Sequence, residues 1–346
     1  MSAPLVAEVD ELTPAWLSSA LGRRVDTVTA RPVGTGQIGT CFRLTLTGDP
    51  HLPATVLAKL PAADPAARAL LANPYRTELR FYREILPTLA VRAPQPYYAD
   101  MAAEGGDFVL LLEDLAPAEQ GDQIAGCTVD QVRDAVVNLA GLHGPRWCDP
   151  TLLAIEGLAL NGPDDAALMA ELFGPAADLF LSNLAGLLAP GDEATVRAVP
   201  DVIERWALAR AERFGLVHGD YRLDNLLFPP GGGPGVVAVD WQTLSLALPA
   251  RDLAYAIATS LDPDARRAAE RELVAAYHAA LVGHGVAAYS LEECWDDYRF
   301  AQLQVPLVAV FGQAYGARTE RGDRMFAVMT ARSCAAVRDL GTLDLV

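Results

Sequence analysis

The chain of 346 residues contains almost no lysine. Lys59 is its single lysine, and every other cationic side chain except histidine is arginine. A chain that uses arginine wherever a cation is needed keeps lysine where a compact, flexible ammonium serves better than a planar guanidinium. Binding phosphate as a point charge is one such task. The alternative is that one lysine survived by chance, and the residues around position 59 must decide between the two interpretations.

The chain also lacks a basic surplus, paired cysteines and long hydrophobic runs. Its formal net charge is −17, which argues against general affinity for nucleic acid or anionic membranes, because both need a basic face. The five dispersed cysteines fit a reducing compartment. The N-terminus has acids where a signal peptide has bases, and no run approaches a membrane span in length. We expect a cytoplasmic protein without membrane insertion; the sequence indicates no oligomeric state.

The residue patterns predict two parts of different character. In the first part, helix and strand patterns are expected over 13–22 (helix), 25–32, 41–46, 54–60 (strands), 75–86 (helix) and 107–112 (strand). In the second part, helices are expected over 128–143, 165–188, 192–213, 264–284, 291–311 and 321–339. Strands and turns over 216–242 interrupt them. We predict an α+β bilobal fold, with an N-lobe over 1–115 built on a small antiparallel sheet and a larger, mainly helical C-lobe over 116–346.

Gly34, Gly36 and Gly39 form a glycine-rich turn that matches the pattern G-x-G-x-x-G. A dinucleotide-binding fold needs a helix directly after this motif, but the residues after Gly39 alternate as a strand does. A glycine loop between antiparallel strands can cover nucleotide phosphates, because glycine lets backbone amides approach phosphate oxygens. The alternatives are an ordinary hairpin turn and a Rossmann oxidoreductase, which a strand after Gly39 would eliminate.

The helix expected over 75–86 tests the importance of Lys59. At 100° per residue, Glu78 lies near the middle of the apolar stripe, whereas Glu84 lies outside it. A carboxylate on a buried face is costly unless a cation meets it. We predict that Lys59 is that cation; alternatively, Glu78 meets an arginine or lies at the exposed end of the stripe.

Asp220, Asn225 and Asp240 carry the strongest chemical signal. Asp220 and Asn225 belong to the segment HGDYRLDN, and Asp240 ends a second apolar strand. One amide and one carboxylate are oxygen ligands that suit Mg²⁺, which leaves Asp220 to orient a hydroxyl group and accept its proton. In the alternative reading, these residues only make hydrogen bonds within the loop.

Together with Lys59 and the glycine turn, the segments HGDYRLDN and VDWQ resemble the aminoglycoside phosphotransferase superfamily. The chain is most similar to its ecdysteroid kinase-like (CHK kinase-like) and choline-kinase-related branch, over roughly residues 25–340. The resemblance implies a protein-kinase-like fold with ATP between the lobes. FVLLLEDL resembles the family's hinge, so the adenine would bond to the backbone of Glu113, Asp114 and Leu115.

The same resemblance implies a role for each candidate residue. Lys59 would hold the α- and β-phosphates, and Glu78 would position Lys59. Asp220 would be the catalytic acid/base, while Asn225 and Asp240 would bind Mg²⁺. His218 is expected to organise the loop, with Asp252 as its partner, and His143 to be structural.

One departure from protein kinases bears on the acceptor. Trp241 and Gln242 follow the metal-binding acid, and only about ten residues separate Asp240 from the next helical segment. This leaves no long activation segment as a platform for a peptide. We therefore predict a kinase that phosphorylates a hydroxyl group of a small molecule, with ATP and Mg²⁺ as cofactors. The alternatives are a catalytically silent nucleotide-binding pseudokinase and a protein kinase.

The identity of the acceptor is left open by the sequence. The acidic composition suits a cationic acceptor, such as an amino sugar, an antibiotic or a choline-like alcohol. The aromatic C-terminal helices equally suit a sterol-like alcohol, although core packing also explains those residues. Residues 296–299 either line an acceptor pocket or form a solvated charged face.

Overall fold

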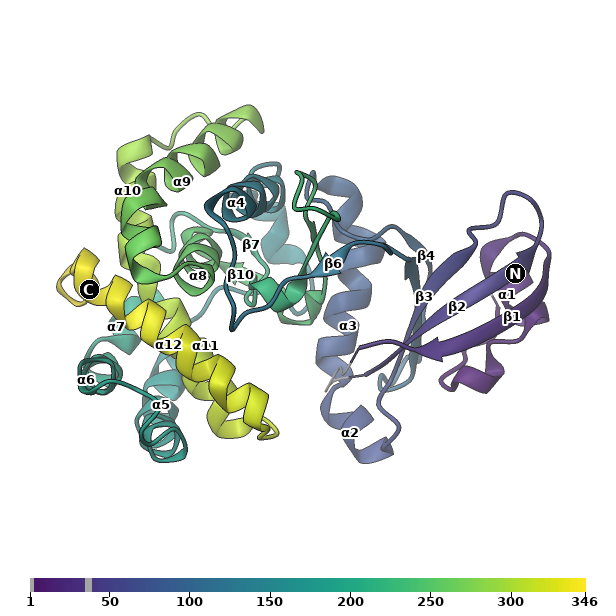
Figure 1. Ribbon diagram of the computed structural model, residues 1–346, viewed down its shortest axis with the longest axis horizontal. Coiled ribbons are helices and arrows are strands. Elements are labelled where there is room, and N and C mark those ends of the chain that lie inside the picture. The colour runs from purple at the N-terminus through teal and green to yellow at the C-terminus, as the bar shows by residue number, and fades with distance from the viewer. Residues whose placement is uncertain (1–2, 35–38) are drawn as a thin grey trace. The chain divides into compact units, whose positions relative to one another are not determined.

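A computed structural model describes residues 3–34 and 39–346 (Figure 1). Gly36 lies outside the described residues. The chain divides into two compact units. The first comprises Met1–Thr88, Ala93–Pro117 and Val239–Leu244; the second comprises Leu89–Arg92, Ala118–Ala238 and Ser245–Val346. The assignment of a nucleotide-covering role to residues 1–115 and an acceptor-binding role to 116–346 stays a prediction.

A five-stranded antiparallel sheet forms the centre of the first unit, in the order β1-β2-β3-β5-β4. Its strands are β1 (Val25–Pro32), β2 (Thr40–Gly48), β3 (Thr55–Leu60), β4 (Pro96–Met101) and β5 (Phe108–Glu113). The predicted antiparallel sheet is therefore confirmed. Because β2 starts directly after Gly39, the residues there form a strand rather than a helix, which eliminates the Rossmann alternative.

Alternation along β3 determines the face on which Lys59 lies. Ala58 and Leu60 belong to the buried core on one face of the sheet, which α1 (Pro14–Leu21) covers. Side chains alternate between faces along a strand, so Lys59 points to the opposite face. In the sheet it lies beside Cys41 of β2 and Leu110 of β5.

The helix expected over 75–86 is divided in the structure. It starts earlier, as α3 (Ala72–Arg80), and continues as a π-helical turn over Phe81–Ile85 and a 3₁₀ turn over Leu86–Thr88. The predicted inner face is confirmed, because Glu78 is buried and Glu84 is exposed. A short helix, α2 (Pro65–Leu70), was not predicted; Asp64 caps its first turn.

Helices make up most of the second unit, as predicted. They are α4 (Val129–His143), α5 (Pro163–Asn183), α6 (Pro190–Ala198), α7 (Ile203–Leu208), α8 (Ala250–Ser260), α9 (Pro263–Gly283), α10 (Leu291–Phe300), α11 (Gln304–Tyr315) and α12 (Glu320–Leu340). Short strands complete the unit: β6 (Glu119–Gln120), β7 (Gly215–Val217), β8 (Leu226–Phe228), β9 (Val237–Ala238) and β10 (Ser245–Ala247). The helix predicted over 165–188 ends earlier, at Asn183, and two other predicted helices are each divided into two. The one over 192–213 is interrupted near Pro200, and the one over 291–311 by a 3₁₀ turn over Ala301–Leu303.

Helix α8 is the central helix of this unit, and all of its residues are buried. It packs against α4, α9, α10, α11 and α12, which surround it (Figure 1). A helix that is buried all round offers a rigid support for polar side chains that must be held in one place. Across residues 3–34 and 39–346, none of the helices combines the length and the apolar character that a membrane crossing requires.

Candidate active site

The first group of site residues surrounds Lys59 in the first unit. The Lys59 ammonium lies 2.8 Å from Glu78 Oε1 and 2.6 Å from Glu78 Oε2. The two side chains are 13% and 1% exposed. The predicted pairing of the lone lysine with the buried glutamate is therefore present, and the alternative of an arginine partner or an exposed glutamate is wrong.

The charges around Lys59 keep it protonated. Burial acts to lower the pKa of Lys59, but the carboxylates of Glu78 and Asp240 outweigh it, so the pKa is raised above its usual range. Burial raises the pKa of Glu78, and the charge of Lys59 opposes this shift. Gln242, whose contribution the sequence did not reveal, donates a hydrogen bond from Nε2 to Glu78 Oε2 over 3.1 Å. The ion pair is thus held by Asp240 on the Lys59 side and by Gln242 on the Glu78 side.

Asp240 lies at the exposed edge of this group. Its Oδ1 is 3.3 Å from the Lys59 ammonium, and its side chain is 41% exposed. The backbone of Asp240 is left-handed, with φ of 67°, a conformation that aspartate tolerates better than most residues. Directly after it, the ring of Trp241 stacks on Phe81, with centroids 3.7 Å apart and planes 9° apart. The buried Trp241 therefore fixes the position of the neighbouring carboxylate.

The described ends of the glycine turn need glycine for two different reasons. Gly34 has a φ of 76°, which favours glycine. At Gly39, a Cβ atom would lie only 2.8 Å from the carbonyl oxygen of Leu60, so a side chain would collide with β3 beside Lys59. Binding of phosphate by Gly34, Gly36 and Gly39 stays a prediction.

The expected hinge follows β5. The carboxylate of Asp114 accepts hydrogen bonds from Arg43 Nε and Nη2, over 2.7 and 3.1 Å. Burial opposes the shift, but Arg43 and neighbouring donors hold the pKa of Asp114 below its usual range. The Asp114 side chain is therefore engaged within the sheet. Bonding of adenine to the backbone of Glu113, Asp114 and Leu115 stays a prediction.

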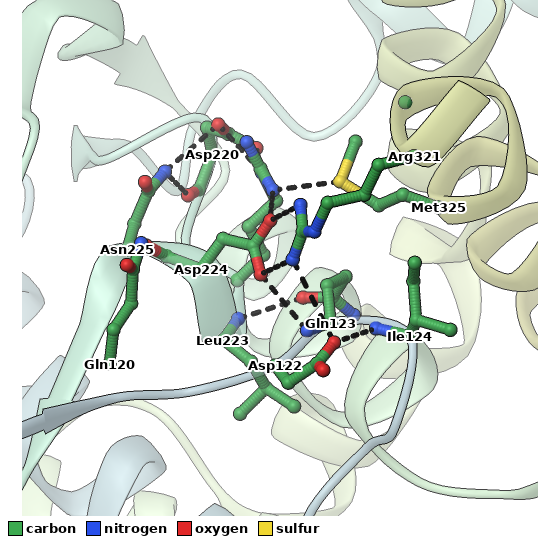
Figure 2. Close-up of polar contacts among 12 residues, drawn as sticks. Gln120, Asp122, Gln123, Ile124, Asp220, Leu223, Asp224, Asn225, Arg321 and Met325 are labelled. Atoms are coloured by element: carbon green, nitrogen blue, oxygen red, sulfur yellow. Dashed lines mark hydrogen bonds and ion pairs between the residues drawn. The ribbon is translucent and has the colours of Figure 1, made fainter. Parts of the chain in front are cut away.

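The second group surrounds Asp220 in the second unit (Figure 2). Asp220 Oδ1 accepts hydrogen bonds from Arg222 Nε at 2.9 Å and from the Tyr255 hydroxyl at 2.8 Å. Its Oδ2 accepts from Arg222 Nε at 3.0 Å and from Asn225 Nδ2 at 2.9 Å. The structure thus brings Asp220 and Asn225 together, as predicted, and holds both carboxylate oxygens in place.

Asp252 of α8 fixes the loop that carries Asp220. This fully buried carboxylate accepts the backbone N–H groups of His218 at 2.5 Å and of Gly219 at 3.0 Å. The predicted link between His218 and Asp252 is therefore present through the backbone of His218. His218 Nδ1 accepts the N–H of Asp220 at 3.3 Å, so this histidine organises the loop as expected. His143, also buried, lies 3.4 Å from Asp252 and shows the expected structural contacts.

Arg222 and Tyr255 are site residues that the sequence reasoning missed. Arg222 stands inside the motif itself, two residues after Asp220. Tyr255 could have been found from Asp252, because residues three apart share one face of a helix. Burial, and then the charge of Asp220, raise the pKa of Tyr255 well above its usual value, so its hydroxyl stays protonated and donates.

Replacement of Tyr255 by phenylalanine is expected to lower kcat about tenfold. A hydrogen bond to a charged group contributes roughly 1.5–3 kcal/mol, and its loss leaves Asp220 less firmly oriented. Steady-state kinetics and thermal unfolding of the variant test this. Tyr277→Phe is the matched control, because that buried hydroxyl contacts His143 rather than Asp220. An equal loss of activity in both variants would contradict a specific role for Tyr255.

Residues 296–299 do not form a solvated face throughout. Asp297 is fully buried and binds Arg210 at 2.5 Å and Arg213 at 2.7 Å, so that expectation is wrong for Asp297. Asp296 and Arg299, with Trp295, line a cavity of about 280 Å³. Its use as an acceptor pocket stays a prediction.

The chemistry of Asn225 and Asp240 fits Mg²⁺. The Asn225 amide nitrogen is engaged by the backbone oxygen and the side chain of Asp220, which leaves its amide oxygen as the atom for a cation. Asp240 offers a partly exposed carboxylate. Oxygen ligands of this kind, completed by waters and substrate phosphates, are those that Mg²⁺ prefers. Over the described residues, no three His, Cys, Asp or Glu side chains gather as a metal cluster.

The sequence pattern of the phosphotransferase enzyme family (APH) matches residues 29–290. The chain belongs to this family. In the mouse (Mus musculus), acyl-CoA dehydrogenase family member 10 is 46% identical to it over 48 residues. That match spans 14% of this chain and 4% of the mouse protein, so it covers only a small part of either.

Solved structures show the same fold at low sequence identity. A microcompartment-associated aminopropanol kinase is 15% identical, and the match covers 93% of this chain and 95% of the kinase, with a TM-score of 0.56. APH(2″)-IIa, in its gentamicin complex, is 13% identical, and the match covers 96% of this chain and 97% of that chain, with a TM-score of 0.51. ADP-bound APH(2″)-Ib is 14% identical, and the match covers 92% of this chain and 96% of that chain, with a TM-score of 0.52. The bilobal, kinase-like fold predicted from the sequence is thereby confirmed.

Proposed function

We propose that this phosphotransferase transfers the γ-phosphoryl group of ATP to a hydroxyl group of a small molecule, with Mg²⁺ as cofactor. The proposal rests mainly on the charged group around Lys59. A buried ammonium is held by one buried carboxylate and lies beside a second carboxylate that is partly exposed. A protein of net charge −17 needs such a local cation to bind a polyphosphate.

Lys59 and Glu78 are proposed to serve the nucleotide. Glu78 holds the ammonium in one position, so the charge is placed before the α- and β-phosphates arrive. The glycine turn adds backbone donors, and the backbone of residues 113–115 receives the adenine. The ADP found with APH(2″)-Ib supports the use of a nucleotide by this fold.

Asp220 is proposed to orient the acceptor hydroxyl and take its proton during transfer. Its two oxygens are fixed by Arg222, Tyr255 and Asn225. A fixed carboxylate loses little freedom when the acceptor binds, which is how positioning lowers the barrier of phosphoryl transfer. Bound Mg²⁺ would neutralise charge on the phosphates, with Asn225 and Asp240 as its protein ligands.

A small acceptor fits the short connection after Asp240. Helix α8 starts at Ala250, which leaves about ten residues between the two and no long segment on which a peptide could lie. The aminopropanol kinase and the gentamicin complex are examples of this fold with small hydroxyl compounds. We propose that the chain is related to the ecdysteroid kinase-like and choline-kinase-related branch of the family. Its acceptor would be an amino sugar, an antibiotic, or a choline-like or sterol-like alcohol. We also propose that the protein acts in the cytoplasm.

A screen of metabolites and antibiotics tests the proposal. The purified protein is incubated with ATP or GTP and Mg²⁺, and products are detected by the mass of an added phosphoryl group. We expect one class of small alcohols to be phosphorylated, and chelation of Mg²⁺ by EDTA to stop the reaction until the metal is restored. Nucleotide binding without turnover on any compound would favour the pseudokinase alternative. Transfer to proteins alone would favour the protein kinase.

A further inference from the structure

Asp224 is an acidic residue of the catalytic loop that the proposed function does not use. It lies between Asp220 and Asn225 in the sequence, and only 9% of its surface is exposed. Its Oδ1 accepts the backbone N–H of Gln123 at 3.0 Å. Figure 2 shows its carboxylate facing Arg321, which reaches it from α12. Asp224 therefore links the catalytic loop to the C-terminal helix of the second unit.

Arg222 is shared between two carboxylates. Its Nε binds both oxygens of Asp220, while its Nη1 lies 2.9 Å from Asp224 Oδ2. A guanidinium is a rigid, planar fork, so a shift of one end moves the other. The orientation of Arg222, and through it that of Asp220, depends on how strongly Asp224 attracts the arginine.

Arg321 also neutralises Asp224, from α12. Its Nη1 lies 2.9 Å from Asp224 Oδ2, and its Nη2 lies 3.1 Å from Asp224 Oδ1, which is a bidentate contact. The series of alternating charges thus continues from Asp220 through Arg222 and Asp224 to Arg321. Over residues 3–34 and 39–346, Arg222 and Arg321 are the arginines in contact with Asp224. Without Arg321, only Arg222 would remain, so Asp224 would compete with Asp220 for it.

We propose that Arg321 is a positioning residue for phosphoryl transfer. By sharing the charge of Asp224, Arg321 lets Arg222 keep its contacts with both oxygens of Asp220, in the orientation that receives the acceptor proton. The inference rests on the proposed function of Asp220 and adds a requirement from a helix about one hundred residues further along the chain. Arg321 touches no reacting atom in this proposal and acts only through Asp224 and Arg222.

A purely structural role for Arg321 predicts a different result. Its side chain is 58% exposed, and it lies in the first turn of α12, which Thr319 already caps. Without Arg321, the buried Asp224 carboxylate still contacts Arg222 and the backbone N–H of Gln123, so it is not left without partners. We therefore expect Arg321→Gln to change the thermal midpoint only slightly, while kcat falls roughly tenfold, because small misplacements of catalytic groups are costly. The KM for nucleotide should stay within about twofold, since the Lys59 group is unchanged.

A double-mutant cycle with Asp224→Asn gives the decisive test. Asparagine keeps the shape of Asp224 but removes the charge that competes for Arg222. We expect Asp224→Asn alone to lower kcat by at most about threefold, and Arg321→Gln to cause no further loss in that background. Asp224→Asn is thus expected to restore most of the activity that Arg321→Gln alone loses. Losses that simply multiply in the double variant would overturn the proposal.

Two controls separate this inference from the proposed function. Arg318→Gln removes another arginine near the start of α12, which binds Asp323 and Asn183, and should leave kcat unchanged. If Asp220→Asn retains full activity, the proposed function fails first; if it abolishes activity and Arg321→Gln does not lower kcat, only the role of Arg321 is wrong. Should Arg321→Gln not fold, Arg321→Lys replaces it in the cycle, because lysine keeps the charge but loses the bidentate contact.

Discussion

Replacement of Asp220 by asparagine is expected to lower kcat by about 10²–10⁴-fold, the range that a positioned proton acceptor contributes. Asparagine matches the size of aspartate and keeps one oxygen to accept from Tyr255 or Arg222. It cannot take the proton of the acceptor hydroxyl. Because Asp220 is not among the residues proposed to bind the nucleotide, the Kd for nucleotide should change little.

Single-turnover kinetics and calorimetric titration with nucleotide measure the two effects separately. Asp178→Asn is the control, because this exposed aspartate pairs with Arg197 away from the loop. The thermal midpoint shows whether loss of charge opposite Arg222 weakens the fold, and Asp220→Ala provides a second variant. Unchanged phosphoryl transfer in both Asp220 variants, with the protein folded, would show that the assigned mechanism is wrong.

The parts of the site that the sequence predicted depend on local periodicity. A period of two along β3 places Lys59 opposite the core face that holds Ala58, and a period of 3.6 places Glu78 inside the stripe of α3. A buried carboxylate needs a cation, and the chain has a single lysine on the preceding strand. Composition and periodicity together therefore predicted a contact between residues nineteen positions apart.

The contacts that the sequence did not predict depend on tertiary packing. Nothing in the pattern around Gln242 indicates that its amide reaches Glu78, far earlier in the chain. Arg222 was visible in the motif, but an arginine beside several acids has many possible partners, and only the structure identifies Asp220 and Asp224. The fold class was predictable because it depends on many residues at once. The individual polar partners were not, because each depends on a few.

Two helix breaks were not predicted, for a related reason. The apolar pattern continues through Pro200 and through Ala301–Leu303, so it indicated one helix where the structure has two. A periodic pattern reports which face is buried, whereas a break depends on local backbone hydrogen bonds. The roles of the site residues, the metal and the acceptor remain predictions, since they concern molecules that bind to the chain.

Replacement of Lys59 by arginine is expected to lower kcat/KM for the nucleotide about 10²-fold while the fold stays intact. The charge is kept, so the buried Glu78 still has a cationic partner and is not left uncompensated, a loss that costs about 3–5 kcal/mol. The guanidinium is planar and larger than the ammonium, and it must fit a side-chain position that is only 13% exposed. It therefore cannot bring the same compact charge to Glu78, Asp240 and the phosphates together.

Steady-state kinetics with nucleotide as the varied substrate, together with thermal unfolding, test this prediction. Lys59→Met is the useful contrast, because it leaves Glu78 without the cation that holds it and should lower the thermal midpoint as well as the activity. A loss of activity in Lys59→Arg without a loss of stability would show that the ammonium group itself is required. Near-normal turnover of Lys59→Arg would instead favour the interpretation that the single lysine of this arginine-rich chain survived by chance.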